Sequence, residues 1–211
     1  ITILKHNYDE TDFKAALQIA FEHDNTVLIE KFIPGREFRI FIINDEVVGI
    51  LHRVPANVTG DGVLNIGQLI DRKNEDPLRG KGYRTPLEKI RKGREEEMFL
   101  KQQGMDFNTV PKEREVVYLR ENSNISTGGD SIDFTDDIDD SYKAIAVEAA
   151  KALNVKITGL DMMIQDIHAP ATPDNYAIIE MNFNPAIHIH CYPFKGKNRH
   201  LNHKMIKALG F

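Results

Sequence analysis

Residues 157–184 read ITGLDMMIQDIHAPATPDNYAIIEMNFN, and this stretch decides the fold. Two runs within it, 157–167 and 175–184, are rich in Ile, Met and other apolar residues, and the Pro-containing segment 168–174 separates them. Apolar runs of this length with turn-forming residues between them are typical of two paired β-strands. The stretch therefore predicts a β-hairpin, and with it a fold that contains antiparallel sheet.

The predicted hairpin carries three side chains with oxygen atoms, Asp161, Glu180 and Asn182. Because side chains alternate between the two faces of a strand, Glu180 and Asn182 share one face and Met181 points to the other. If Asp161 pairs across the hairpin, its charge lies in a mostly apolar sheet, where uncompensated charge is costly. A divalent cation that prefers oxygen ligands, such as magnesium, would compensate it and contact substrate phosphates. Strand-end capping explains any one of these residues, but for the whole set we favour a metal site beside a nucleotide.

A second informative stretch is VLIEKFIPGRE, residues 27–37, in which an apolar strand ends at Pro34-Gly35. A strand of this kind can offer backbone N–H and C=O groups to the edge of an adenine ring, with apolar side chains on both sides of the ring. Glu37 would then lie near a ribose hydroxyl. Strands that end in a turn are common in proteins, so this stretch alone only suggests a nucleotide site.

Together, the two stretches resemble the ATP-grasp family of carboxylate-amine ligases. EKFIPGRE, residues 30–37, is similar to the family's hinge between the lobes that grip the nucleotide. The resemblance implies that ATP contacts Glu30, the backbone of Lys31, Phe32 and Ile33, and Glu37. It also implies that Mg²⁺ or Mn²⁺, as a pair of ions in an intact enzyme, binds Asp161, Glu180 and Asn182.

Further stretches narrow the resemblance within this family. They are HRVPANVTGDGVLNIGQLID (52–71), NEDPLRGKGYRTPLEKI (74–90), NISTGGDSIDFTDDI (124–138) and IEMNFNPAIHIHCYP (179–193). These stretches resemble the ATP-grasp half of the bacterial bifunctional glutamate-cysteine ligase/glutathione synthetases. The resemblance covers nearly the whole chain, from Ile1 to Phe211.

This resemblance implies an enzyme that forms a C–N bond. ATP would phosphorylate the C-terminal carboxylate of γ-glutamylcysteine, and the amine of glycine would displace the phosphate to form an amide. An upstream glutamate-cysteine ligase domain in the same chain would make it a bifunctional enzyme of glutathione biosynthesis. Two alternatives stay open: a peptide ligase similar to cyanophycin synthetase, and a non-catalytic nucleotide-binding module.

The resemblance also implies the fold class. This class is α+β with α/β-like features, in which a mainly antiparallel sheet is flanked by helices, as in the C-terminal lobe of the ATP-grasp fold. The family's other lobe has phosphate-binding lysines and a glycine-rich loop, and we expect the chain to begin after both. Residues 1–211 are therefore expected to be a partial ATP-grasp domain that folds as one unit but does not ligate by itself.

Hydrophobic periodicity and turn residues predict the remaining elements. They are strands at 1–5, 26–33 and 116–119, a hairpin around Asn44-Asp45, and helices at 10–23, 66–70, 86–103 and 141–154. Six aspartates in residues 130–140 precede the last helix and complement its dipole. The run Glu95–Glu97 is interpreted as a solvated helix face. The glycine-containing segment 53–71 is expected to be a mobile lid.

Two arginines are candidate catalytic residues. Arg53 borders a loop and could neutralise a transferred phosphate, although an exposed structural arginine is an equal alternative. Arg120 begins a polar loop that contains Asn122, Asn124 and Gly128-Gly129, and this loop could bind a peptide carboxylate. A structural role for this loop is an equal alternative.

Composition limits the class of protein. The 211 residues include 27 Lys and Arg against 32 Asp and Glu, a net charge of −5, so the chain has no overall attraction for nucleic acid. No apolar run approaches the roughly 20 residues of a membrane span, and the first residues lack the pattern of a signal peptide. The single Cys191 fits a reducing compartment. We therefore expect a cytoplasmic protein with small-molecule substrates and no membrane partner.

Overall fold

A computed structural model of the chain describes residues 9–22, 24–29, 31 and 33–211. The chain forms two compact units, 1–34 and 35–211, where a single unit was expected. In the first unit, helix α1 spans Glu10–Phe21, which confirms the helix predicted there. The described residues of 26–33 form no strand, so the strand expected in that run is wrong for them, and the strand expected at 1–5 lies outside the described residues. In the described part, no helix has the length and apolar character needed to cross a membrane.

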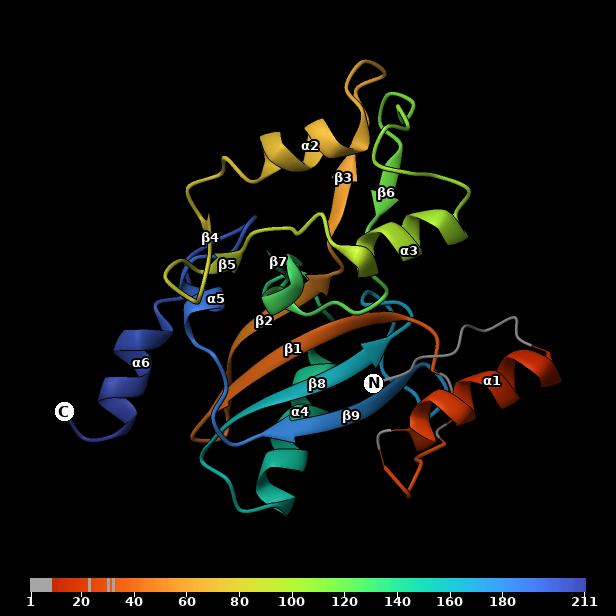
Figure 1. Ribbon diagram of the computed structural model, residues 1–211. Coiled ribbons are helices and arrows are strands. Elements are labelled where there is room, and N and C mark those ends of the chain that lie inside the picture. Colours follow the sequence, from red (N-terminus) through yellow and green to blue (C-terminus); the bar gives the residue numbers. More distant parts are fainter. Residues whose placement is uncertain (1–8, 23, 30, 32) are drawn as a thin grey trace. The chain divides into compact units, whose positions relative to one another are not determined.

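Residues 35–211, all of which the structure describes, centre on a five-stranded sheet (Figure 1). Its strand order is β7-β2-β1-β8-β9, and every neighbouring pair is antiparallel. The strands are β1 (Arg36–Ile43), β2 (Glu46–Val54), β7 (Asp130–Asp133), β8 (Ile157–Ile164) and β9 (Tyr176–Asn182). The antiparallel sheet and the β8–β9 hairpin are therefore as predicted.

The predicted turn at Asn44-Asp45 joins β1 to β2. Both residues have positive φ, 48° for Asn44 and 64° for Asp45. Positive φ at both central residues is the requirement of a type I′ turn, whose twist matches that of the strands it connects. This hairpin sets the register in which Arg39 faces Leu51 across the sheet.

One face of the sheet is covered by helix α4, Asp140–Ala152. The helix begins where Asp139 accepts a hydrogen bond of 2.9 Å from the backbone N–H of Ser141, which confirms the expected role for this aspartate. Asp130 and Asp133 instead lie in β7 and pair with cations there, so the expectation is wrong for them. Alternate strand residues on this face pack against Tyr142, Ala146 and Ala150 of α4. The strand residues in this core are Phe38, Ile40, Ile42, Ile50, Leu160, Met162 and Ile164. The faces of the sheet are thus fixed by burial of its apolar residues.

The opposite face of the sheet is divided into an apolar and a polar part. Helices α5 (His188–Cys191) and α6 (Leu201–Ala208) contribute Cys191 and Leu201 to a core cluster with Phe41, Ile43 and Val48. The polar part has charged side chains on β1, β2, β8 and β9 and is the candidate functional site. Figure 1 shows α6 at one end of the sheet and β9 at its edge.

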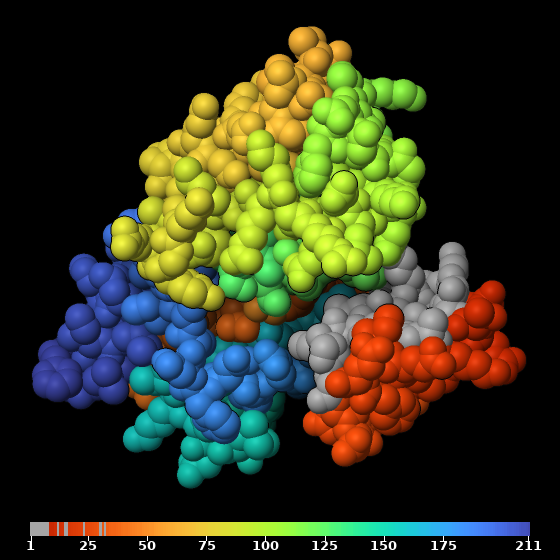
Figure 2. Space-filling model, in the orientation of Figure 1, coloured from red at the N-terminus to blue at the C-terminus, as the bar shows by residue number. Residues whose placement is uncertain are grey.

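An insert of residues 55–129 connects β2 to β7 and carries its own core. Its elements are β3 (Asn57–Thr59), α2 (Ile66–Lys73), β4 (Arg79–Gly80), β5 (Leu87–Glu88), α3 (Arg94–Gln102), β6 (Val116–Tyr118) and the 3₁₀ turn η1 (Ile125–Thr127). Strand β3 pairs with β6, and β4 pairs with β5. Figure 2 shows the insert, coloured orange to green, as a continuous layer of packed side chains. The strand predicted at 116–119 and the helix predicted at 66–70 are confirmed.

The insert corrects two expectations. The expected lid, 53–71, includes Val58, Ile66 and Ile70, which are buried in the insert's core with Leu100 and Val117. A segment that supplies half of a hydrophobic core is held by that core, which argues against a loosely attached lid.

Helix α3 begins at Arg94 and not at Pro86, because residues 87–88 pair with β4. The backbone N–H of Gly93 donates to the Glu96 carboxylate at 2.9 Å and starts the helix there. Glu96 is only 1% exposed, so the run Glu95–Glu97 is not a wholly solvated face.

Candidate functional site

The register of the sheet places three polar residues opposite one another on three neighbouring strands. Arg39 on β1 faces Asp161 on β8, and Asp161 faces Glu180 on β9. Directly opposed residues share a face of a sheet, so these side chains lie in one row on the polar face. The sequence predicted the positions of Asp161 and Glu180, whereas Arg39 was not recognised.

Glu180 and Asn182 are brought together as predicted. The side-chain amide of Asn182 donates to Glu180 at 2.9 Å. Met181 between them packs against the core on the α4 side of the sheet. The register shifts between Asp161 and Met162, so Ile179 is an extra residue that bulges from β9 beside Glu180. The side chains of Glu180 and Asn182 therefore both lie on the polar face, on the edge strand β9.

The carboxylate of Asp161 is only 2% exposed and is held by two guanidinium groups. Arg39 donates from Nε to one carboxylate oxygen and from Nη2 to the other, the second bond being 2.8 Å long. Arg53 donates from Nη2 to the same second oxygen at 2.9 Å. Paired donors of this kind form the strongest class of hydrogen bond to a carboxylate. The buried charge of Asp161 is thus compensated within the protein.

Arg53 also links Asp161 to Glu37. Its Nη2 forms an ion pair with Glu37, which accepts a second bond from the hydroxyl of Ser123. Among the described residues, the Nε of Arg53 is buried without a hydrogen-bond partner. An unpartnered donor between the residues assigned to ribose and to metal suits an anionic oxygen of a ligand. Arg53 is therefore not an exposed structural arginine, and its contact with a phosphate stays a prediction.

The predicted hinge is described only in part. Glu30 and Phe32 lie outside the described residues. Lys31 is exposed and Ile33 is half-buried, and both belong to the unit 1–34, whereas Glu37 belongs to the unit 35–211. Contact of these residues with adenine and ribose stays a prediction.

Arg120 is held by acidic residues of helix α3. Its Nε donates to Glu96 at 2.7 Å, and its Nη1 forms an ion pair with Glu95. Because Glu96 is buried, this pair fixes α3 to the start of the loop 121–129. A role for Arg120 in binding substrate stays a prediction.

The loop 121–129, at the end of the insert, contacts both the polar face and the rest of the insert. Ser123 in this loop bonds Glu37, and a Cβ atom on Gly129 would lie 2.8 Å from the carbonyl oxygen of Val54. The carbonyl of Gly128 accepts a 3.0 Å bond from Arg79, whose side chain is fully buried. The close approach at Gly129 requires glycine, and the loop is therefore firmly seated on both sides.

Arg79 belongs to a buried network around Asp130. The guanidinium of Arg79 and the ammonium of Lys73 both bond the Asp130 carboxylate, the latter at 2.7 Å. Burial lowers the pKa of Lys73, and the charge of Asp130 opposes that shift. The sequence drew attention to Asp130 only as one of the aspartates before α4, and not to Lys73 or Arg79, because single charges in a polar stretch usually are solvated.

The donors on the polar face fit a magnesium or manganese ion in their chemistry. In the described part of the chain, no group of three or more His, Cys, Asp and Glu is arranged to hold a metal. A site here would therefore need the amide oxygen of Asn182 beside the carboxylates of Asp161 and Glu180. Carboxylate and amide oxygens are ligands that these hard cations prefer. The nitrogen of Asn182 faces Glu180, which leaves its oxygen for such a role.

The whole chain is similar in sequence to known proteins. No family model matches the chain. A curated protein of Desulfotalea psychrophila, named glutathione biosynthesis bifunctional protein GshAB, is 63% identical over 211 residues, which are 100% of this chain and 27% of that protein. A protein of the same name from Clostridium perfringens is 56% identical over 209 residues, or 99% of this chain and 27% of the relative.

A solved structure agrees with these relatives. The crystal structure of a bifunctional glutathione synthetase from Pasteurella multocida matches with a TM-score of 0.78 and 46% sequence identity. The match covers 95% of this chain and 28% of the other. The chain thus spans about a quarter of the length of the relatives it matches.

Proposed function

Because the chain belongs to the family of the bifunctional glutathione biosynthesis proteins and has their ATP-grasp fold, we propose that it supplies the nucleotide and metal face of a glutathione synthetase-type ligase. The reaction is the ATP-dependent joining of γ-glutamylcysteine and glycine through an acyl phosphate. A glutamate-cysteine ligase domain upstream in the same protein supplies the dipeptide, and the protein acts in the cytoplasm.

The observation that carries this proposal is the single polar face that joins Glu37, Arg53 and Asp161 by direct contacts and extends to Glu180. A ligase of this class needs no protein nucleophile, because it works by positioning groups and neutralising charge. The face offers oxygen ligands and guanidinium groups side by side, which is what a nucleotide triphosphate with its cations requires.

Each residue of the face has a definite part in this mechanism. Arg39 holds Asp161 in one orientation through both carboxylate oxygens. Arg53 can turn its unpartnered Nε toward a phosphate oxygen while it keeps Glu37 in place. Glu37 stays available to a ribose hydroxyl because it is partly exposed. Ions of Mg²⁺ or Mn²⁺, two in number in our proposal, would be held by Asp161, Glu180 and Asn182 and would supply positive charge to phosphate oxygens.

Replacement of Glu180 by Gln tests this proposal. The measurement is glycine-dependent phosphate release and tripeptide formation by the longest naturally encoded protein that contains this chain, with ATP, magnesium and γ-glutamylcysteine. Loss of one ligand charge should lower turnover at least about tenfold and raise the magnesium concentration needed for half-maximal rate. Because Glu180 is exposed, the unfolding transition should stay unchanged.

The matched control is Glu148→Gln on the exposed side of α4, where the same charge is removed far from the polar face. This variant should keep the activity and the magnesium dependence of the wild type. Equal magnesium dependence in Glu180→Gln and the wild type would contradict the metal site. Absence of glycine-dependent phosphate release in the wild type would contradict the reaction itself.

A further inference from the structure

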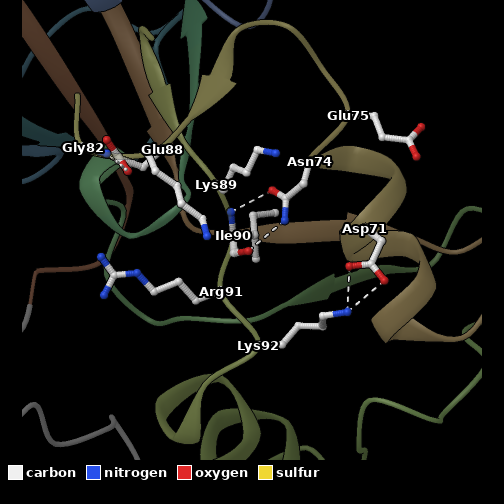
Figure 3. A pocket seen from close by; sticks show the side chains of 10 residues that line it. Asp71, Asn74, Glu75, Gly82, Glu88, Lys89, Ile90, Arg91 and Lys92 are labelled. Carbon is white, nitrogen blue, oxygen red and sulfur yellow. Dashed lines mark hydrogen bonds and ion pairs between the residues drawn. The ribbon is translucent and has the colours of Figure 1, made fainter. Parts of the chain in front are cut away.

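A cavity of about 690 Å³ lies in the insert, between the end of α2 and the segment that follows β4 (Figure 3). Its charged lining comprises four cations and three acids: Lys81, Lys89, Arg91, Lys92, Asp71, Glu75 and Glu88. We call it the basic cavity. Its volume falls within the range of small-molecule sites, about 300–1,000 Å³. None of these residues has a part in the reaction described above.

The charges of the basic cavity are only partly matched by one another. Lys92 pairs with Asp71, bonding both carboxylate oxygens at 2.7 and 2.8 Å. The carboxylate of Glu88 accepts from the backbone N–H groups of Gly82 and Tyr83. Among the described residues, the side chains of Lys81, Lys89 and Arg91 have no ion-pair partner. Among the described residues, the cavity therefore holds three cations and two acids, Glu75 and Glu88, that lack an ion-pair partner, and of these acids only Glu88 is bonded by backbone N–H groups.

Two of these cations are attached to a rigid wall. The side chain of Asn74 donates to the carbonyl of Ile90 and accepts from its N–H, both at 2.8 Å. Ile90 is only 3% exposed and packs in the insert's core. Lys89 and Arg91 flank Ile90 in the chain, so their backbone positions are fixed before any ligand arrives. Figure 3 shows the reciprocal bond between Asn74 and Ile90, and it shows Arg91 and Lys92 extending to opposite sides of the segment.

The lining of the basic cavity also excludes some classes of ligand. Among the described residues, Ile90 is the only one with an aliphatic side chain that lines the cavity, and Ile90 is buried. A nucleotide base stacks well on an aromatic side chain, and the described residues that line this cavity include none. The acids Glu75 and Glu88, which lack a cationic partner among the described residues, would repel a multiply charged phosphate. A small, polar ligand with carboxylates and an ammonium group fits the mixture of charges better.

We infer that the basic cavity binds the amino-acid end of an acidic peptide substrate, with its α-carboxylate toward the unmatched cations Lys89 and Arg91. The inference rests on the proposed function, since γ-glutamylcysteine has such an end, remote from the carboxylate that reacts. The loop 121–129 approaches Ile90 of the cavity wall and Glu37 of the polar face. A Cβ atom on Gly128 would lie 2.8 Å from Cα of Ile90, and Ser123 of the same loop bonds Glu37.

The test uses Lys89→Met and Arg91→Met, singly and together, in the longest naturally encoded protein that contains this chain. A charge-assisted hydrogen bond lost from a ligand weakens binding by about tenfold. The KM for γ-glutamylcysteine should therefore rise about tenfold in each single variant and further in the double variant. The KM values for ATP and glycine should stay near those of the wild type.

Two controls separate this effect from a general loss of charge. Lys92→Met removes a cation of the same cavity that Asp71 already matches, so the KM for the dipeptide should change much less. Lys204→Met removes an exposed lysine on α6, and all kinetic constants should stay unchanged. An effect of Lys92→Met as large as that of Arg91→Met would overturn the assignment of the carboxylate to unmatched cations.

Calorimetric binding of γ-glutamylcysteine to the same proteins, without ATP, separates this inference from the proposed reaction. Weaker binding in the double variant supports the cavity even if the wild type fails to ligate. Equal binding in the wild type and the double variant, or none in either, overturns it. A rise in the KM for ATP with an unchanged KM for the dipeptide also overturns it, because the cavity would then serve phosphate.

Discussion

The polar face of the sheet and the basic cavity both gather charged side chains, but they treat charge in opposite ways. On the polar face, the buried carboxylate of Asp161 lies between Arg39 and Arg53, and Glu37 matches the second guanidinium. In the basic cavity, Lys89 and Arg91 reach the surface without an ion-pair partner in the described residues. Buried charge must be compensated inside the protein, whereas an exposed cation is compensated by water. Substitutions of the buried charges on the polar face should therefore change stability, and those of the unmatched cations in the cavity should change only binding.

Replacement of Arg39 by Met should have the largest effect on stability. It leaves Asp161, which is 2% exposed, with Arg53 as its single cationic partner. Removing one partner of a buried ion pair typically costs about 3–5 kcal/mol, so we expect a loss of about 3 kcal/mol in the free energy of unfolding. Urea denaturation at neutral pH measures it.

Two further variants serve as controls for Arg39→Met. Arg114→Met, which removes an exposed arginine, should change the free energy of unfolding by less than about 0.5 kcal/mol. The double variant Arg39→Met/Asp161→Leu should recover part of the loss, because no uncompensated charge then stays buried. If Arg39→Met is as stable as Arg114→Met, the two regions do not differ in the way we describe.

His190 sharpens the comparison, because it is buried without any partner. Both ring nitrogens lack hydrogen-bond partners among the described residues, and the ring packs against Phe41. Burial, helped by the charge of Arg39, lowers the pKa of His190 from 6.5 to about 3. Asp161 is buried but paired with guanidinium groups, so it can carry a charge. His190 is buried without a partner, so it stays neutral.

Stability should therefore depend on pH through His190. Below pH 6.5 the unfolded chain binds a proton that the folded chain does not, so this contribution is complete above pH 6.5 and is lost as the pH falls toward 3. Between these two pH values the contribution changes by about 1.4 kcal/mol per pH unit. Between pH 6.5 and pH 4, His190→Leu should lose less stability than the wild type, as measured by urea denaturation. The carboxylates titrate in both proteins, so their contribution cancels in this comparison. Parallel pH profiles would show that His190 titrates normally.

Local periodicity explains what could be predicted of the site. Glu180 and Asn182 lie two residues apart on one strand, so their shared face follows from strand geometry alone. The hairpin of β8 and β9 brings Asp161 opposite Glu180 across a short connection, which the Pro-containing segment already indicated. The turn at Asn44-Asp45 was equally local, since its residue types favour positive φ.

Long-range pairing explains what could not be predicted. Arg39 looks like any other residue of its strand, and its role depends on a register with Asp161, 122 positions away. The helix expected from Pro86 starts late because β5 pairs with β4, a pairing that helical periodicity cannot reveal. The glycines of the expected lid concealed Val58 and Ile70, whose core partners come from α3 and β6. Neither the Asp130 network nor the basic cavity has a sequence signature, because both assemble single charges from several elements.

The smallest effect is expected from Lys89→Met and Arg91→Met when stability is measured. Neither cation matches an acid among the described residues, and Arg91 is exposed. Surface substitutions of this kind usually change the free energy of unfolding by less than about 0.5 kcal/mol. Urea denaturation of the two variants should therefore give midpoints close to that of the wild type, even where the KM for the dipeptide has risen. Lys92→Met, which breaks an exposed pair, should lose at most about 1 kcal/mol. A large loss of stability in Arg91→Met would mean that its charge is matched within the fold, and the contrast between the cavity and the polar face would then disappear.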